Sequence, residues 1–299
     1  MPMNEASHLL RSNCVTKAAR FSRFACVDWS GAKGSRHPGI ALAVCKTGSS
    51  APVLVAPAGK HWSRFEIAEW LLAQDDDLLI GFDFSFAPPL IERGSYLPGE
   101  LLPSTAKEFW AYVEALCDDE DLGAASFLEH HYRRHFYFGA ADGVKSHFLH
   151  WRQCEILNKN GSGKTSTVFD AIGASQVAKA SFAGMRFLNL VGSRISVWPF
   201  DPLPNTGPVI VEIYTTIAAR AAGVAKGRSK IRDGTRLDTA LAAFGSAQHQ
   251  PLDRYTDHAT DAILTAAWLR HVAENPAIWQ PNQLNRDIAQ TEGWTFGVD

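Results

Sequence analysis

Four acidic residues of this chain stand in apolar surroundings, where an ionised carboxylate is costly unless it is paired or bound to a metal. Three of them end or interrupt strand-like apolar runs, and the fourth lies early in an Ala-rich helical pattern; they are Asp28, Asp83, Glu212 and Asp261. Because the carboxyl ends of strands in an α/β sheet meet at one rim, we expect these side chains to converge. Mg²⁺ and Mn²⁺ prefer such hard oxygen ligands.

A carboxylate set of this kind indicates metal-assisted hydrolysis. Two divalent ions about 3.5–4 Å apart can activate water and stabilise the leaving oxygen of a phosphodiester. Asp257 lies one helical turn before Asp261, so either acid could reach a metal. We therefore predict Mg²⁺ or Mn²⁺ as cofactor. The predicted metal ligands are Asp28, Asp83, Glu212, Asp257 and Asp261, and all of these except Asp257 are predicted to be catalytic.

Taken singly, the acids also have simpler interpretations. An Asp at a strand end often caps a turn, which would explain Asp28 or Asp83 without any metal. Glu212 could point outward from a half-exposed strand. Asp257 fits the N-cap of the last long helix. The order and context of the whole set favour the functional interpretation.

The elements that must position these acids follow from the apolar patterns. Three strand-like runs separated by Gly and Ser predict an antiparallel meander, followed by a helix with Ser63 as N-cap and a fourth strand. Two further strands and several helices come later in the chain. The predicted strands are 24–28, 39–45, 52–56, 78–83, 194–199 and 209–214, and the predicted helices are 62–73, 104–117, 125–135, 171–190, 215–223, 235–244 and 257–272.

Four motifs resemble those of a family of predicted ribonuclease-H-like nucleases that is catalogued as a domain of unknown function. They are VDWSG at 27–31, GFDFSF at 81–86, VEIYT at 211–215 and DHATDA at 257–262. The final helix also resembles that of RuvC-type resolvases, in which an acid pair precedes an Ala-rich helix. The resemblance covers roughly 24–86 and 195–272.

The resemblance implies a fold and a division of roles. The fold is α/β, a ribonuclease-H-like mixed sheet flanked by helices with a helical insertion after the fourth strand. Asp28 would bridge the metals, Asp83 or Glu212 would ligate one of them, and Asp261 would complete the site. The implied activity is hydrolysis of nucleic-acid phosphodiester bonds, in DNA or RNA.

The predicted organisation has three parts. Residues 1–23 form a disordered leader, 24–275 the ribonuclease-H-like domain with its helical insertion at about 90–190, and 276–299 a C-terminal tail.

Composition excludes several classes of protein. The formal net charge of −2 over 299 residues gives no sign of the basic surface typical of non-specific duplex binding. Five cysteines without a CxxC pair favour reduced thiols rather than a disulfide framework or a zinc site. No stretch approaches the length of a transmembrane helix. We expect a cytoplasmic protein without membrane contact; the sequence does not define its oligomeric state.

Cations near the predicted rim could hold a phosphate backbone. The residues predicted to bind substrate are Lys33, Lys164, Arg228 and His258. The segment 158–165 (NKNGSGKT) imitates a P-loop, but it lacks the first Gly and a preceding buried strand, so we interpret it as a loop. Trp29 is expected to pack rather than to stack a base.

Two other functional classes stay open. Asp28 to Lys33 also suits the phosphate-binding hairpin of actin-like ATPases and sugar kinases, which share the core fold. Those enzymes need two such domains, for which 299 residues leave little room. A non-catalytic ribonuclease-H-like binding protein is the third hypothesis.

Overall fold

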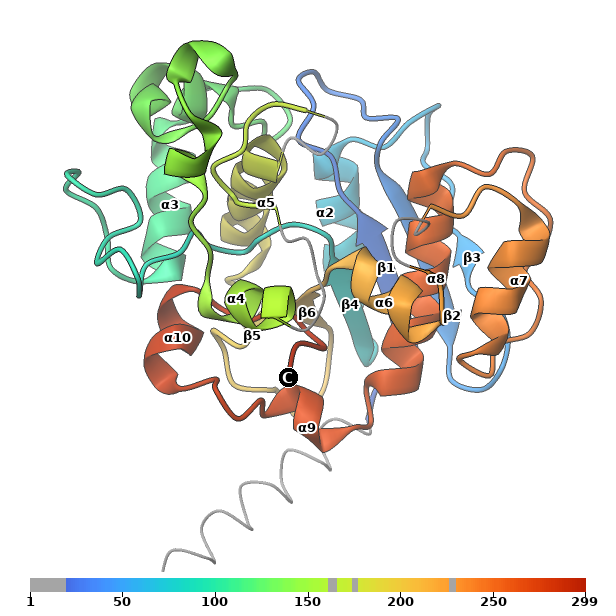
Figure 1. Cartoon of the computed structure of the whole chain (residues 1–299). Helices are drawn as coiled ribbons and strands as arrows, with labels where there is room; N and C mark the ends of the chain where they lie inside the picture. Colours follow the sequence, from blue (N-terminus) through green and yellow to red (C-terminus); the bar gives the residue numbers. More distant parts are fainter. Residues whose placement is uncertain (1–19, 161–165, 174–176, 226–229) are drawn as a thin grey trace, which may run out of the picture.

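A computed structural model describes residues 20–160, 166–173, 177–225 and 230–299 (Figure 1). Over these residues the chain is an α/β structure with a six-stranded mixed sheet in the order β3-β2-β1-β4-β6-β5, flanked by helices. The strands are β1 (Arg23–Asp28), β2 (Ala41–Lys46), β3 (Val53–Leu54), β4 (Leu78–Phe82), β5 (Ser196–Trp198) and β6 (Val209–Glu212).

The sheet has an antiparallel half and a parallel half. β1 pairs antiparallel with β2, and β2 with β3, which confirms the predicted meander. β1, β4, β6 and β5 run parallel. The carboxyl ends of the parallel strands therefore share one rim.

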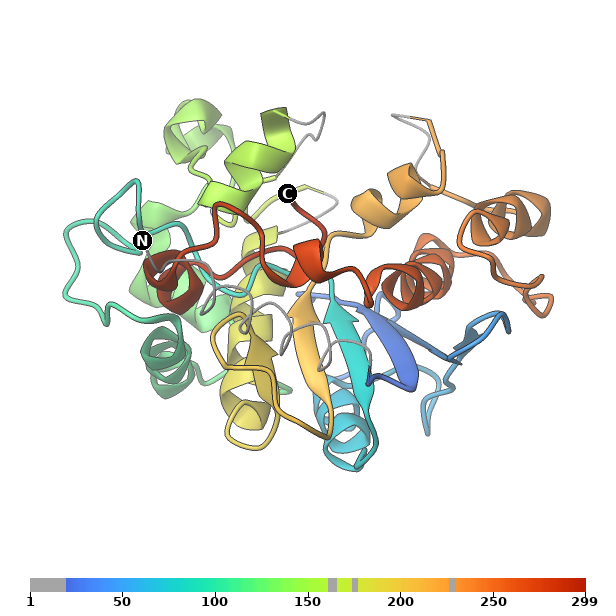
Figure 2. The same cartoon turned by 90° about the horizontal axis from the view of Figure 1, so that it is seen from below.

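Helices cover both faces of the sheet (Figure 2). One face packs against α8, and the other packs against α2 and α5, so that two separate apolar clusters form. The described helices are α2 (Arg64–Leu72), α3 (Ala106–Leu116), α4 (Gln153–Asn160), α5 (Val177–Val191), α6 (Thr215–Ala221), α7 (Gly234–Ala242), α8 (Asp257–Val272), α9 (Pro276–Trp279) and α10 (Arg286–Thr291).

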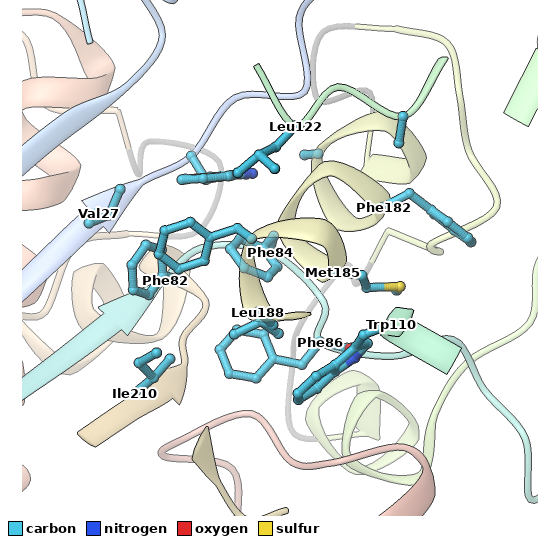
Figure 3. Packing of buried hydrophobic residues seen from close by; sticks show 14 of the residues in the cluster. Val27, Phe82, Phe84, Phe86, Trp110, Leu122, Phe182, Met185, Leu188 and Ile210 are labelled. Atoms are coloured by element: carbon cyan, nitrogen blue, oxygen red, sulfur yellow. The ribbon is translucent and has the colours of Figure 1, made fainter. Parts of the chain in front are cut away.

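Aromatic side chains fill the space between the sheet and α5 (Figure 3). Phe82 and Phe84 lie 5.8 Å apart, centroid to centroid. Trp29 contacts both of these rings, is 5% exposed and belongs to this core, as expected. A Cβ on Gly184 of α5 would lie 2.3 Å from the Phe84 ring, so only glycine permits this approach.

The helix starts show which capping predictions hold. Ser63 caps α2 and forms a reciprocal capping box with Glu66, as the sequence predicts. The predicted N-cap of α8, Asp257, is wrong by one residue. Thr256 is the N-cap and accepts a hydrogen bond from the Ala259 N–H, and Asp257 lies in the first turn.

The predicted helical insertion at about 90–190 contains α3, α4 and nearly all of α5. α5 packs against α2 and α3, and its side chains belong to the same cluster as those of β1 and β4. The predicted helix at 125–135 is instead a π-helical turn (Phe127–His131) followed by a 3₁₀ turn (Arg133–His135).

The predicted tail at 276–299 is part of the fold. It contains α9 and α10 and ends with Trp294, Phe296 and Val298 buried in the cluster beside α8. Of the predicted leader, residues 1–19 lie outside the described residues. Phe21 is 3% exposed and stacks on Trp279 of α9, so the domain begins before residue 24.

Replacing Trp294 by Ala tests whether the C-terminal segment belongs to the core. The indole is fully buried, and its N–H donates to the Val298 carbonyl at 2.8 Å. The expected loss is about 3–5 kcal/mol of unfolding free energy, measured by urea denaturation. Leu101→Ala is the control, since Leu101 is 98% exposed and should change stability by less than about 0.5 kcal/mol. Equal stabilities of the two variants would contradict the assignment.

Candidate functional site

Two aspartates lie side by side at the rim of the parallel strands. Val27 of β1 is in register with Phe82 of β4, and the Asp83 N–H donates to the Val27 carbonyl at 3.2 Å. Asp28 and Asp83 therefore occupy neighbouring positions. The preceding residues, Val27 and Phe82, belong to the apolar cluster on the α5 side of the sheet. Because side chains alternate along a strand, Asp28 and Asp83 face the opposite side, toward α8.

Helix α8 brings a third aspartate and a histidine to this pair. The His258 Nδ1 lies 3.1 Å from an Asp28 carboxylate oxygen. One turn further on, Asp261 accepts a hydrogen bond from the Lys230 Nζ at 2.7 Å. Together with Asp28 and Asp83 these residues line one cavity of about 550 Å³. Asp28 and Asp261 are buried, at 7% and 8% exposure.

Burial and the closeness of the three carboxylates change the acidity of two of these aspartates. Burial, together with the neighbouring carboxylates of Asp28 and Asp261, raises the pKa of Asp83 to about 8. Burial likewise raises the pKa of Asp261 to about 6, against the opposing effect of Lys230. The hydrogen bond to Asp28 raises the pKa of His258. Ionising all three aspartates at once is therefore unfavourable in this cavity.

A buried arginine fixes the loop that follows Asp28. The guanidinium of Arg64, at the start of α2, donates to the Ser30 carbonyl at 2.7 and 3.0 Å and to the Ala32 carbonyl at 2.7 Å. Gly31 passes so close to α5 that a Cβ there would lie 2.1 Å from the Ala180 nitrogen. Asp121 accepts from the Arg64 backbone N–H and faces His37 at 2.8 Å. His37 is thereby a buried structural residue.

Glu212, predicted as a ligand beside these aspartates, lies on the other side of the sheet. Its neighbours Val211 and Ile213 face α8, whereas Ile210 faces the α5 cluster. Alternation turns Glu212 the same way as Ile210, where it is 2% exposed and paired with Arg152 at 2.5 Å. Glu212 still lines the cavity, but it does so from the opposite wall.

The other predicted ligands and substrate contacts divide into three groups. Asp257 pairs with Arg232 at 2.9 Å, and Lys33 pairs with Glu129 at 2.9 Å; neither Asp257 nor Lys33 lines the cavity. His258 does line it. Lys164 and Arg228 lie outside the described residues. The segment before the P-loop-like sequence is the helix α4 rather than a strand, which agrees with its interpretation as a loop.

Sequence reasoning missed Arg152, Glu155 and Thr295, which form the wall opposite Asp28. The only local signal is the spacing of Arg152 and Glu155, an i,i+3 ion pair at 2.9 Å. That spacing is common on helices and points to no particular site. Thr295 carries no signal, since it reaches Glu212 from a distant part of the chain.

The donor set suits a hard divalent cation in its chemistry. Asp28, Asp83 and Asp261 offer carboxylate oxygens in one buried cavity. Across the described ranges, no three His, Cys, Asp or Glu side chains are already gathered as ligands around one point. Lys230 and His258 hold two of the aspartates instead, so an ion would have to replace these contacts.

Comparison with known proteins leaves the family undetermined: no family model, curated protein or solved structure matches the chain. Within the described part of the chain, no helix is long and apolar enough to cross a membrane.

The raised pKa of Asp83 predicts how stability depends on pH. The ordinary value is 3.8 and the folded value about 8, so the folded state holds this proton more tightly than the unfolded state. Asp83 therefore lowers the free energy of unfolding progressively as pH rises from about 4 to about 8. Asp83→Asn cannot ionise and should gain at least about 1 kcal/mol relative to wild type between pH ~5 and ~8.5.

This pH dependence is measured by urea unfolding in EDTA at both pH values. Asp75→Asn is the matched control, because Asp75 is exposed. An equal effect of Asp83→Asn at both pH values would show that Asp83 is not under electrostatic strain.

Proposed function

We propose that this protein is a divalent-metal-dependent nuclease of ribonuclease-H-like fold. The observation that carries the proposal is the meeting of Asp28, Asp83 and Asp261 in one buried cavity. Burial and, after it, the neighbouring carboxylates raise the pKa of Asp83, as expected for acids placed close together away from water. A divalent cation supplies compensating charge, and acids in such surroundings are typical of functional sites.

The strand arrangement supports the ribonuclease-H-like assignment. An antiparallel meander leads through a helix to a parallel fourth strand, which lies beside β1. The acids come from the end of β1, from the residue after β4, and from the first turns of α8. These three acids belong to the motifs that carry the resemblance found in the sequence.

The chain's own residues define what the cavity can do. Asp28, Asp83 and Asp261 would hold Mg²⁺ or Mn²⁺, which supplies Lewis-acid activation of water and of the phosphodiester. Lys230 and His258 now compensate Asp261 and Asp28. Once a bound ion carries that charge, Lys230 and His258 are available to bind phosphate oxygens. Arg64 keeps the loop after Asp28 in place through the Ser30 carbonyl.

The proposed substrate is a phosphodiester of DNA or RNA. The cavity volume of about 550 Å³ lies in the range of sites that enclose a small molecule, so it would admit a nucleotide-sized part of a strand. Lys230 is a positive charge inside it, and the hydrogen bond to Asp28 raises the pKa of His258, which favours its protonated form. The net charge of −2 argues against a broad electrostatic grip on duplex nucleic acid.

Asp28→Asn tests the proposal. The substitution removes one ligand charge while keeping the shape of the side chain, so the variant should fold and lose metal-dependent cleavage by about 100-fold or more. The assay incubates wild type and variant with Mn²⁺ and labelled single- and double-stranded DNA and RNA. Circular dichroism checks the fold.

Asp253→Asn is the control for this experiment, since Asp253 is exposed and does not line the cavity. It should cleave like the wild type. Cleavage retained by Asp28→Asn would refute the assignment of the site. Mn²⁺ binding without cleavage of any substrate would favour a binding protein instead.

A further inference from the structure

An arginine whose N–H groups are all hydrogen-bonded, Arg152, lies on the cavity wall opposite the three aspartates. Arg152 is 1% exposed, and hydrogen bonds engage every N–H direction of its guanidinium. Nε donates to Glu155 at 3.0 Å and Nη2 to Glu155 at 2.9 Å. Nη1 donates to Glu212 at 2.6 Å and to the Glu292 carbonyl at 3.1 Å, and Nη2 donates to Glu212 at 2.5 Å.

The carboxylate of Glu212 is equally saturated. Besides its two bonds from Arg152, it accepts from the Phe86 N–H at 2.7 Å and from the Thr295 hydroxyl at 2.6 Å. Two carboxylate oxygens offer about four lone-pair directions, and four donors occupy them here. No lone pair of Glu212 is left to coordinate a metal ion.

The bidentate ion pair between Arg152 and Glu212 resists replacement by a metal ion. Guanidinium and carboxylate are matched in shape, and charge-assisted bonds of this kind are stronger than neutral ones. Opening the pair would leave Glu212 buried without its cation, while Arg152 would keep only Glu155 as an ion-pair partner. The partners of Asp261 and Asp28, which are Lys230 and His258, are only half-buried and so are easier to displace. A divalent ion should therefore bind the three aspartates in preference to Glu212.

We infer that Arg152 is the permanent cation of Glu212, and that the cavity, with Asp28, Asp83 and Asp261 as its only remaining aspartate ligands among the described residues, takes one divalent ion rather than two. This inference rests on the proposed function. It divides the acids into a metal-binding group, Asp28, Asp83 and Asp261, and a structural carboxylate, Glu212. Arg152 is a positioning residue: it joins β6 to α4 through Glu155 and to the C-terminal segment through the Glu292 carbonyl.

The number of bound Mn²⁺ ions tests the inference. Calorimetric titration of the wild type with Mn²⁺ should give one ion per chain. Glu212→Gln keeps the shape and the acceptor oxygen of the side chain, and it should bind one ion with an affinity within about threefold of wild type. Asp28→Asn should weaken binding about 100-fold or more. Circular dichroism confirms that each variant is folded.

Electron paramagnetic resonance of the Mn²⁺-loaded wild type gives an independent answer that needs no variant. One isolated ion shows an uncoupled hyperfine spectrum, whereas two ions about 4 Å apart are magnetically coupled. One uncoupled ion supports the inference.

Two bound ions, or the loss of an ion in folded Glu212→Gln, would overturn the inference while the proposed function stands. No bound Mn²⁺ in the wild type would overturn the proposed metal site and the inference together. The ion count distinguishes these outcomes.

Discussion

Side-chain alternation along the parallel strands is the constraint on which the site depends. β1, β4 and β6 end at one rim, but neighbouring residues of each strand face opposite sides of the sheet. Asp28 and Asp83 share the α8 side, whereas Glu212 is one position out of phase with them and meets Arg152. A shift of one residue along the strand thus decides whether an acid joins the repelling aspartates or forms a fully hydrogen-bonded ion pair.

The close approach of α8 to the sheet makes the first of these groups possible. Small residues of α8, such as Ala262 and Ala266, are fully buried against the sheet. Gly81 of β4 adds space, since a Cβ there would lie 2.6 Å from the Ile213 side chain and 3.0 Å from that of Leu269. A larger residue at 81 would push α8 away, and Asp261 and His258 would move with it.

The periodicity of the sequence was enough to predict the meander, β4 and the long helices, because each has a clear apolar pattern and α2 also has its capping signal at Ser63. The acids in apolar surroundings also led to the expectation that Asp28, Asp83 and Asp261 converge, and all three line one cavity. The position of Glu212 required the pairing register, which a single strand does not reveal. Arg152 and Thr295 were out of reach because their partners are distant in sequence, and the burial of Trp294 was missed because no regular pattern surrounds it.

The contacts of the last described residues also set the order in which the site can form during synthesis. Thr295 bonds the Glu212 carboxylate, the Phe296 N–H donates to the Glu212 carbonyl, and Glu292 accepts from the backbone N–H groups of Leu90, Ile91 and Gln153. All six strands of the sheet precede residue 213. The wall around Arg152 cannot close until residues 292–296 have emerged, so a nascent chain lacking them carries an incomplete cavity.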